Sequence, residues 1–132
     1  MTDHLDWLRR HPPAADSPED PGLAMDLDER GGFLLVTVHG VIDFWSVEPL
    51  REQLDAALRR QPPRLVLDLN EVSFVDSTGL GLLLSLHRGA AAGGGWLHLA
   101  RPRPQLHRLL RTTALDSYFH LYATVDAAAP PP

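Results

Sequence analysis

From residue 23 onward, short apolar runs alternate with longer segments in which apolar residues recur every three or four positions. The short runs are typical of β-strands, and the longer segments are typical of amphipathic helices. The sequence predicts strands at 23–29, 33–41, 64–69, 96–100 and 118–122, with helices at 46–60, 76–91 and 104–112. Strands separated by single helices pair in parallel through right-handed crossovers, which restricts the chain to an α/β sheet fold.

The first two predicted strands are the exception to this parallel arrangement. Arg30-Gly31-Gly32 is a tight-turn sequence and is too short for a crossover, so the strands on either side are expected to form an antiparallel hairpin. We therefore expect a single α/β domain with a mostly parallel mixed sheet, an N-terminal antiparallel hairpin and about three helices. A length of 132 residues suits one such domain.

Proline marks both ends of the predicted domain. Residues 1–22 contain several prolines among acidic and small residues, and we expect a Pro-rich acidic N-terminal tail there. Residues 127–132 end in three prolines, which are incompatible with regular structure, and we expect a second tail. The predicted domain spans residues 23–126.

Composition excludes several functional classes. The chain has no cysteine, which excludes disulfides, thiolate metal sites and cysteine nucleophiles. The formal net charge of −5 argues against direct nucleic-acid binding, which requires a basic surface. The seven histidines lack metal-site spacing, so neither a metal nor another cofactor is expected. Because no secretory signal or membrane-spanning run is visible, we expect a cytoplasmic protein that does not associate with membranes.

The most informative segment lies where the third predicted strand meets the second predicted helix. It reads Phe74-Val75-Asp76-Ser77-Thr78-Gly79-Leu80-Gly81. The polar residues at its centre are all good helix N-caps, so plain capping is one interpretation. A helix N-terminus also favours a phosphate, because its backbone N–H groups are unpaired and its dipole end is positive. Phosphorylation of Ser77 is the other interpretation, in which the two glycines leave room for a protein partner.

Two enzymatic interpretations of this segment do not fit its residues. A phosphate-binding P-loop needs a lysine, and the chain contains none. A hydrolase nucleophile elbow needs a glycine two residues before the serine, where this chain has Val75. We therefore expect a protein that is not an enzyme.

The segment resembles the signature of the STAS family, the sulphate transporter and anti-sigma factor antagonist domains. That signature is an apolar strand followed by Asp, Ser, Ser or Thr, Gly, Leu and Gly, and residues 74–81 match it. Further similarity lies in Gly40-Val41-Ile42-Asp43, in Gly94-Gly95-Trp96-Leu97 and in residues 102–115. The resemblance covers residues 23–125 and implies the STAS fold.

The resemblance implies a bacterial signalling protein of the anti-sigma factor antagonist type, which controls transcription by partner switching. In this family the unphosphorylated antagonist binds an anti-sigma factor that is often also a serine kinase, phosphorylation breaks the complex, and a serine phosphatase restores it. Carried over to this chain, the phosphorylated residue is Ser77, with Thr78 as an alternative. The implied partner-binding residues are Asp43, Phe44, Trp45, Asp76, Ser77, Thr78, Gly79 and Leu80. A monomer or weak dimer is expected.

The sequence departs from the family pattern in one loop. Val41 replaces the usual glutamate, and Phe44 and Trp45 stand where the family usually has polar residues. These aromatic side chains either contact a partner or cover the end of the sheet. The departure leaves open a second function, that of a STAS scaffold or interaction module that is never phosphorylated. A STAS domain that binds a small ligand is a third.

Arginines gather near the third predicted helix of this acidic chain. They form a basic cluster of Arg101, Arg103, Arg108 and Arg111. A solvated helix face and a contact with an acidic partner are both open interpretations of this cluster.

Overall fold

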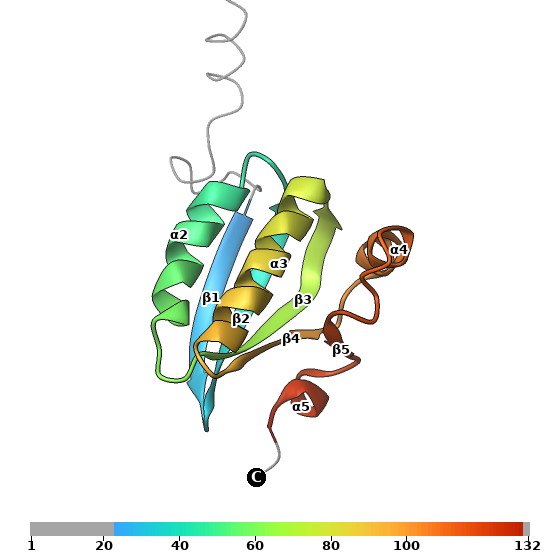
Figure 1. Cartoon of the computed structure of the whole chain (residues 1–132). Helices are drawn as coiled ribbons and strands as arrows, with labels where there is room; N and C mark the ends of the chain where they lie inside the picture. Colours follow the sequence, from blue (N-terminus) through green and yellow to red (C-terminus); the bar gives the residue numbers. More distant parts are fainter. Residues whose placement is uncertain (1–22, 131–132) are drawn as a thin grey trace, which may run out of the picture.

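The computed structural model describes residues 23–130 of the chain (Figure 1). The predicted N-terminal tail, residues 1–22, and the last two residues of the predicted C-terminal tail lie outside these described residues. Within them, no helix is long and apolar enough to cross a membrane.

A five-stranded sheet with strand order β1-β2-β3-β4-β5 forms the centre of the fold. β1 pairs with β2 in the antiparallel direction, and every later neighbouring pair is parallel. The predicted mixed α/β fold with an N-terminal hairpin is therefore confirmed. The strands are β1 (Leu23–Arg30), β2 (Phe33–Ile42), β3 (Arg64–Val75), β4 (Trp96–Ala100) and β5 (His120–Tyr122).

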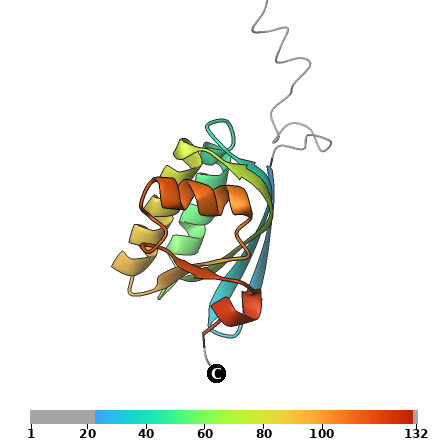
Figure 2. The ribbon, with the colours of Figure 1, turned by 90° about the vertical axis from the view of Figure 1, so that its right-hand side faces the viewer.

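Helices connect the parallel strands, as the alternating pattern predicts. They are α2 (Val47–Leu58), α3 (Ser77–Ala92), α4 (Pro104–Thr112) and α5 (Val125–Ala128). α2 and α3 lie side by side across one face of the sheet, whereas α4 lies at the side of the sheet where β5 is found (Figures 1 and 2). The first turns of α2 and α3 meet the carboxyl ends of β2 and β3, so the loops before these helices share one edge of the sheet.

The core is divided by the sheet, because successive side chains of a strand point to opposite faces. Leu65 and Leu67 of β3 belong to the main cluster, together with the apolar faces of α2, α3 and α4. Val66 points the other way, into a smaller cluster that includes Ala128 of α5. The buried leucines of α2 are Leu50 and Leu54, which recur at helical spacing.

Two elements differ from the sequence-based expectation. β3 continues to Val75 rather than ending at residue 69, because it follows β2 through two register shifts and keeps its backbone hydrogen bonds. Among residues 23–130, α5 is a fourth helix, where about three were expected, and it includes residues 127 and 128 of the predicted tail. Thr124 caps this turn by accepting a hydrogen bond from the Ala127 N–H at 3.0 Å.

Candidate functional site

Asp76 caps the N-terminus of α3 and ties it to the loop before α2. Its Oδ1 accepts a hydrogen bond from the Gly79 N–H at 2.8 Å, and its Oδ2 accepts one from the Phe44 N–H at 3.2 Å. Its own N–H donates to the carbonyl of Ile42 at 3.2 Å. One carboxylate therefore fixes both the helix start and the neighbouring loop, and the capping interpretation applies to Asp76.

Ser77 and Thr78 follow as the first two residues of α3, and both are exposed. Within the described residues, neither hydroxyl makes a hydrogen bond. Since Asp76 does the capping, the Ser77 hydroxyl has no structural role in that part of the chain. It lies exposed at a helix N-terminus.

The two glycines after Thr78 have different roles. A Cβ on Gly79 would lie 2.3 Å from the Ile42 carbonyl oxygen, so the glycine is required by the close approach of α3 to the end of β2. A Cβ on Gly81 would meet no atom of residues 23–130 within 4 Å. Within the described residues, open space is therefore left beside Gly81 and not beside Gly79, and the approach of a partner there stays a prediction.

The loop before α2 is held by its own side chains. Asp43 Oδ1 accepts hydrogen bonds from the Trp45 and Ser46 N–H groups at 3.0 and 3.1 Å. Ser46 stands at the N-cap position of α2 but makes no side-chain capping bond, and its hydroxyl donates to the Val41 carbonyl at 2.7 Å instead. Asp43 thus orders the loop rather than pointing its carboxylate freely at the solvent.

Three large aromatic side chains are exposed around this edge. Phe44 is 63% exposed and Trp45 is 71% exposed, and their rings form an edge-to-face pair with centroids 5.2 Å apart. Phe74, at the end of β3, is 45% exposed, and its backbone is the register partner of Val41. The aromatic rings of the loop therefore do not cover the end of the sheet. Phe74 was not identified from the sequence, because strand alternation places it on the same face as the buried Val72, and the register shift between Gly40 and Val41 breaks that alternation.

Leu80 differs from its predicted place on the partner-binding surface. Its side chain is only 5% exposed and belongs to the main core cluster. The helical period explains this, because Leu80 shares a helix face with Leu83 three positions later, which is fully buried. The predicted contact residues that do lie at or near the surface are Asp43, Phe44, Trp45, Asp76, Ser77 and Thr78.

Gln105 of α4 supports the same edge and was not identified from the sequence. Its side-chain amide donates to the Val75 carbonyl and accepts from the Val75 N–H, both at 2.9 Å. The amide thereby replaces a neighbouring strand at the last residue of β3, immediately before Asp76. Within residues 23–130, no group of three or more His, Cys, Asp or Glu side chains is arranged to hold a metal ion.

Comparisons with known proteins agree on one family. The STAS domain family profile matches residues 24–128. The anti-sigma F factor antagonist of Paenibacillus polymyxa is 32% identical over 101 residues, which are 76% of this chain and 86% of that protein.

Solved structures give the same result for the fold. The crystal structure of an anti-sigma factor antagonist from Mycobacterium paratuberculosis matches with a TM-score of 0.73 and 30% identity, covering 82% of this chain and 92% of that one. The phosphorylated form of the Bacillus cell fate determinant SpoIIAA matches with a TM-score of 0.63 and 25% identity, covering 80% of this chain and 96% of that one.

Proposed function

Because the chain belongs to the STAS domain family, we propose that it is an anti-sigma factor antagonist that binds an anti-sigma factor and is released when Ser77 is phosphorylated. The anti-sigma factor is itself the serine kinase in this proposal, and a serine phosphatase resets the switch. The antagonist performs no chemistry of its own. The observation that carries the proposal is the exposed Ser77 hydroxyl at the first residue of α3, beside a cap that does not need it.

The position of Ser77 suits a reversible charge. A phosphate adds about −1.5 to −2 charge at neutral pH, and the positive end of the α3 dipole tolerates it. The fold is therefore expected to survive phosphorylation, while the surface beside Asp76 becomes strongly negative. A partner surface adapted to a neutral hydroxyl would then lose affinity through repulsion and desolvation, and ~3 kcal/mol would be over a hundredfold.

Relatives support the same role. The Paenibacillus polymyxa protein is named as an anti-sigma F factor antagonist, and the Bacillus SpoIIAA structure is of a phosphorylated form. We propose Phe44, Trp45 and Phe74 as the apolar part of the partner contact, since exposed aromatic residues are enriched at interface hot spots. Asp43 and Asp76 position this surface by fixing the loop and the helix start.

A second function is favoured by the same aromatic residues. A scaffold that stays bound to one partner would also present a rigid apolar surface and would not need Ser77. The two functions differ in what a negative charge at position 77 does to the complex.

Binding by three variants separates these functions. The tagged protein is expressed in its source cells as Ser77→Ala, Ser77→Asp and Ser117→Asp. The proteins that each variant retains are identified, and their affinity for the purified variant is then measured by titration. Ser117 is an exposed serine between α4 and β5, so its variant controls for added charge. The switch predicts that Ser77→Ala and Ser117→Asp retain an anti-sigma factor and that Ser77→Asp loses it. Equal retention by all three variants would favour the scaffold.

A further inference from the structure

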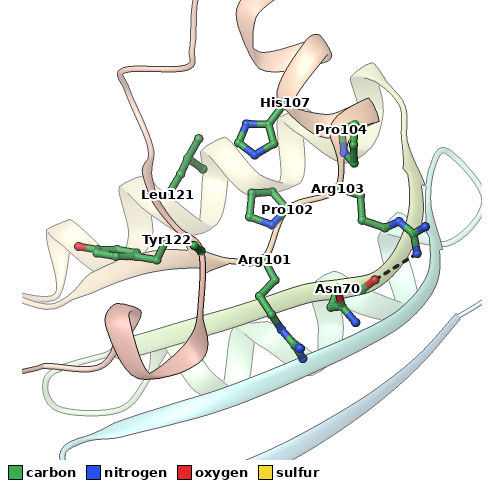
Figure 3. A pocket seen from close by; sticks show the side chains of 9 residues that line it. Asn70, Arg101, Pro102, Arg103, Pro104, His107, Leu121 and Tyr122 are labelled. Atoms are coloured by element: carbon green, nitrogen blue, oxygen red, sulfur yellow. Dashed lines mark hydrogen bonds between the residues drawn. The ribbon is translucent and has the colours of Figure 1, made fainter.

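A cleft of about 610 Å³ opens between the start of α4 and the end of β5 (Figure 3). Arg103 and Asn70 lie on one side of it, and Tyr122 lies on the other, with His107 above and Arg101 below in the view. The cleft begins where the parallel strands β4 and β5 end.

The lining of this cleft is basic although the whole chain is acidic. Arg101, Arg103 and His107 line it, and among residues 23–130 no Asp or Glu does. Arg101 is already matched, because its Nε and one terminal nitrogen donate to Asp68 at 3.0 and 2.7 Å. Arg103 donates only to the neutral carbonyl of Asn70 at 3.3 Å, and within residues 23–130 it forms no ion pair. Arg103 therefore supplies a positive charge that the described part of the chain does not neutralise.

The cleft is held open by a fixed backbone. Arg101 has a φ of 55°, in the left-handed region that a non-glycine residue rarely adopts. Its N–H donates to the Tyr122 carbonyl at 2.8 Å, which joins the two sides of the cleft. Pro102 and Pro104 restrict the chain on either side of Arg103. Backbone strain of this kind persists only where the surrounding structure enforces it, and it gathers at binding sites.

The start of α4 adds to the positive potential. This nine-residue helix has Arg103 at its N-cap position, no side-chain capping bond and no acidic residue in its first turn. Its dipole is therefore uncompensated at the end that faces the cleft.

We propose that this cleft binds a small phosphorylated molecule, with Arg103 as the main phosphate contact and the apolar side chains of Pro102 and Leu121 against the organic part. A guanidinium group matches the geometry of phosphate oxygens, and His107 adds a further donor. The volume lies within the range of small-molecule sites and exceeds what an inorganic ion fills. The proposal concerns residues outside the Ser77 surface and does not depend on the proposed function.

An NMR titration of the full-length protein tests this site. The probes are phenyl phosphate, inorganic phosphate and benzoate at neutral pH, followed through backbone amide and arginine side-chain signals. We expect saturable shifts from phenyl phosphate confined to the cleft, with weaker binding of inorganic phosphate, which lacks a ring, and of benzoate, which carries a single charge. Benzoate binding as tightly as phenyl phosphate would contradict the phosphate assignment.

Two arginine variants provide the matched comparison. Arg103→Gln removes the unpaired charge of the cleft, whereas Arg111→Gln removes an exposed charge at the other end of the same helix. We expect Arg103→Gln to weaken phenyl phosphate binding about tenfold or more, and Arg111→Gln to weaken it less than about twofold. Equal effects of the two variants, or no saturable shift at millimolar phenyl phosphate, would overturn the proposal.

Discussion

The side chain of Gln105 pairs with the backbone of Val75 in both directions, with two hydrogen bonds of 2.9 Å. Val75 is the last residue of β3 and is almost fully buried, and Asp76 and Ser77 follow it directly. The amide of an α4 residue thus completes the hydrogen bonding of the strand that positions the candidate phosphorylation site.

Replacing Gln105 by alanine leaves the Val75 N–H and carbonyl without these partners. Because unsatisfied buried polar groups are costly, we expect Gln105→Ala to lower the free energy of unfolding by about 1–3 kcal/mol. Urea denaturation measures this change, and amide exchange at Val75 is expected to accelerate. Gln53→Ala, at an exposed position of α2, is the control and should change stability by less than about 0.5 kcal/mol. Equal stability of the two variants would contradict a stabilising role for the Gln105 hydrogen bonds with Val75.

Alanine at the two glycines of the α3 start is expected to act in opposite directions. Gly79→Ala places a Cβ 2.3 Å from the Ile42 carbonyl oxygen and forces α3 away from β2, so it should destabilise the fold by about 1–3 kcal/mol, as other overpacked core changes do. Gly81→Ala meets open space within a helix and should stabilise the fold by up to about 1 kcal/mol. Thermal unfolding of both variants tests the pair, and a tolerated Gly79→Ala would contradict the close approach.

The ion pair between Arg101 and Asp68 gives a third prediction. Asp68 is only 4% exposed, and its hydrogen bonds with Arg101 raise the pKa of the guanidinium group. Arg101→Leu leaves a buried carboxylate without its cation, so its melting temperature should fall below that of Arg103→Leu, which breaks no ion pair. The double variant Arg101→Leu/Asp68→Leu should recover part of the loss. A double variant less stable than Arg101→Leu alone would argue against this cause.

Two histidines are expected to make stability depend on pH. Burial lowers the pKa of His87 below its ordinary value of 6.5, and His120 and Arg88 lower it further. Burial and His120 also lower the pKa of His98, although its hydrogen bond to the Ala128 carbonyl opposes them. The unfolded chain therefore binds protons more readily than the folded one near and below pH 6.5. Stability should be full above this value and should fall as the pH drops through it.

The variant His87→Leu tests the pH dependence. The Nδ1 atom of His87 is buried and has no hydrogen-bond partner within the described residues. Leucine therefore removes a proton-binding group without breaking a hydrogen bond of Nδ1 in that part of the chain. We expect the loss of melting temperature between about pH 7 and about pH 5 to be smaller in His87→Leu than in the parent chain. An unchanged slope would mean that other groups cause the pH dependence.

The sequence predicted the sheet, the hairpin and the three longer helices because their apolar periodicity is local. The extension of β3 to Val75 was missed, since Asn70 and Glu71 interrupt its apolar run while pairing with β2 continues. α5 was missed because four residues carry too little periodicity, and its stability comes from Ala128 packing under the sheet.

For the candidate site, the motif identified Asp76 and Ser77, but their roles needed coordinates. The burial of Leu80, the contact behind Gly79 and the bonds of Gln105 all depend on partners distant in the sequence. The exposure of Phe44 and Trp45 was left open by the sequence for the same reason, because it depends on how the loop is held by Asp43 and Asp76.

The most direct test of the proposed switch is intact-mass measurement with phosphopeptide mapping of the protein purified from its source cells, before and after phosphatase treatment. The proposed switch predicts a phosphatase-sensitive phosphate on Ser77 in a fraction of the molecules that changes with growth or stress conditions. A Ser77 that stays unmodified under all of these conditions would contradict the switch and favour the constitutive scaffold.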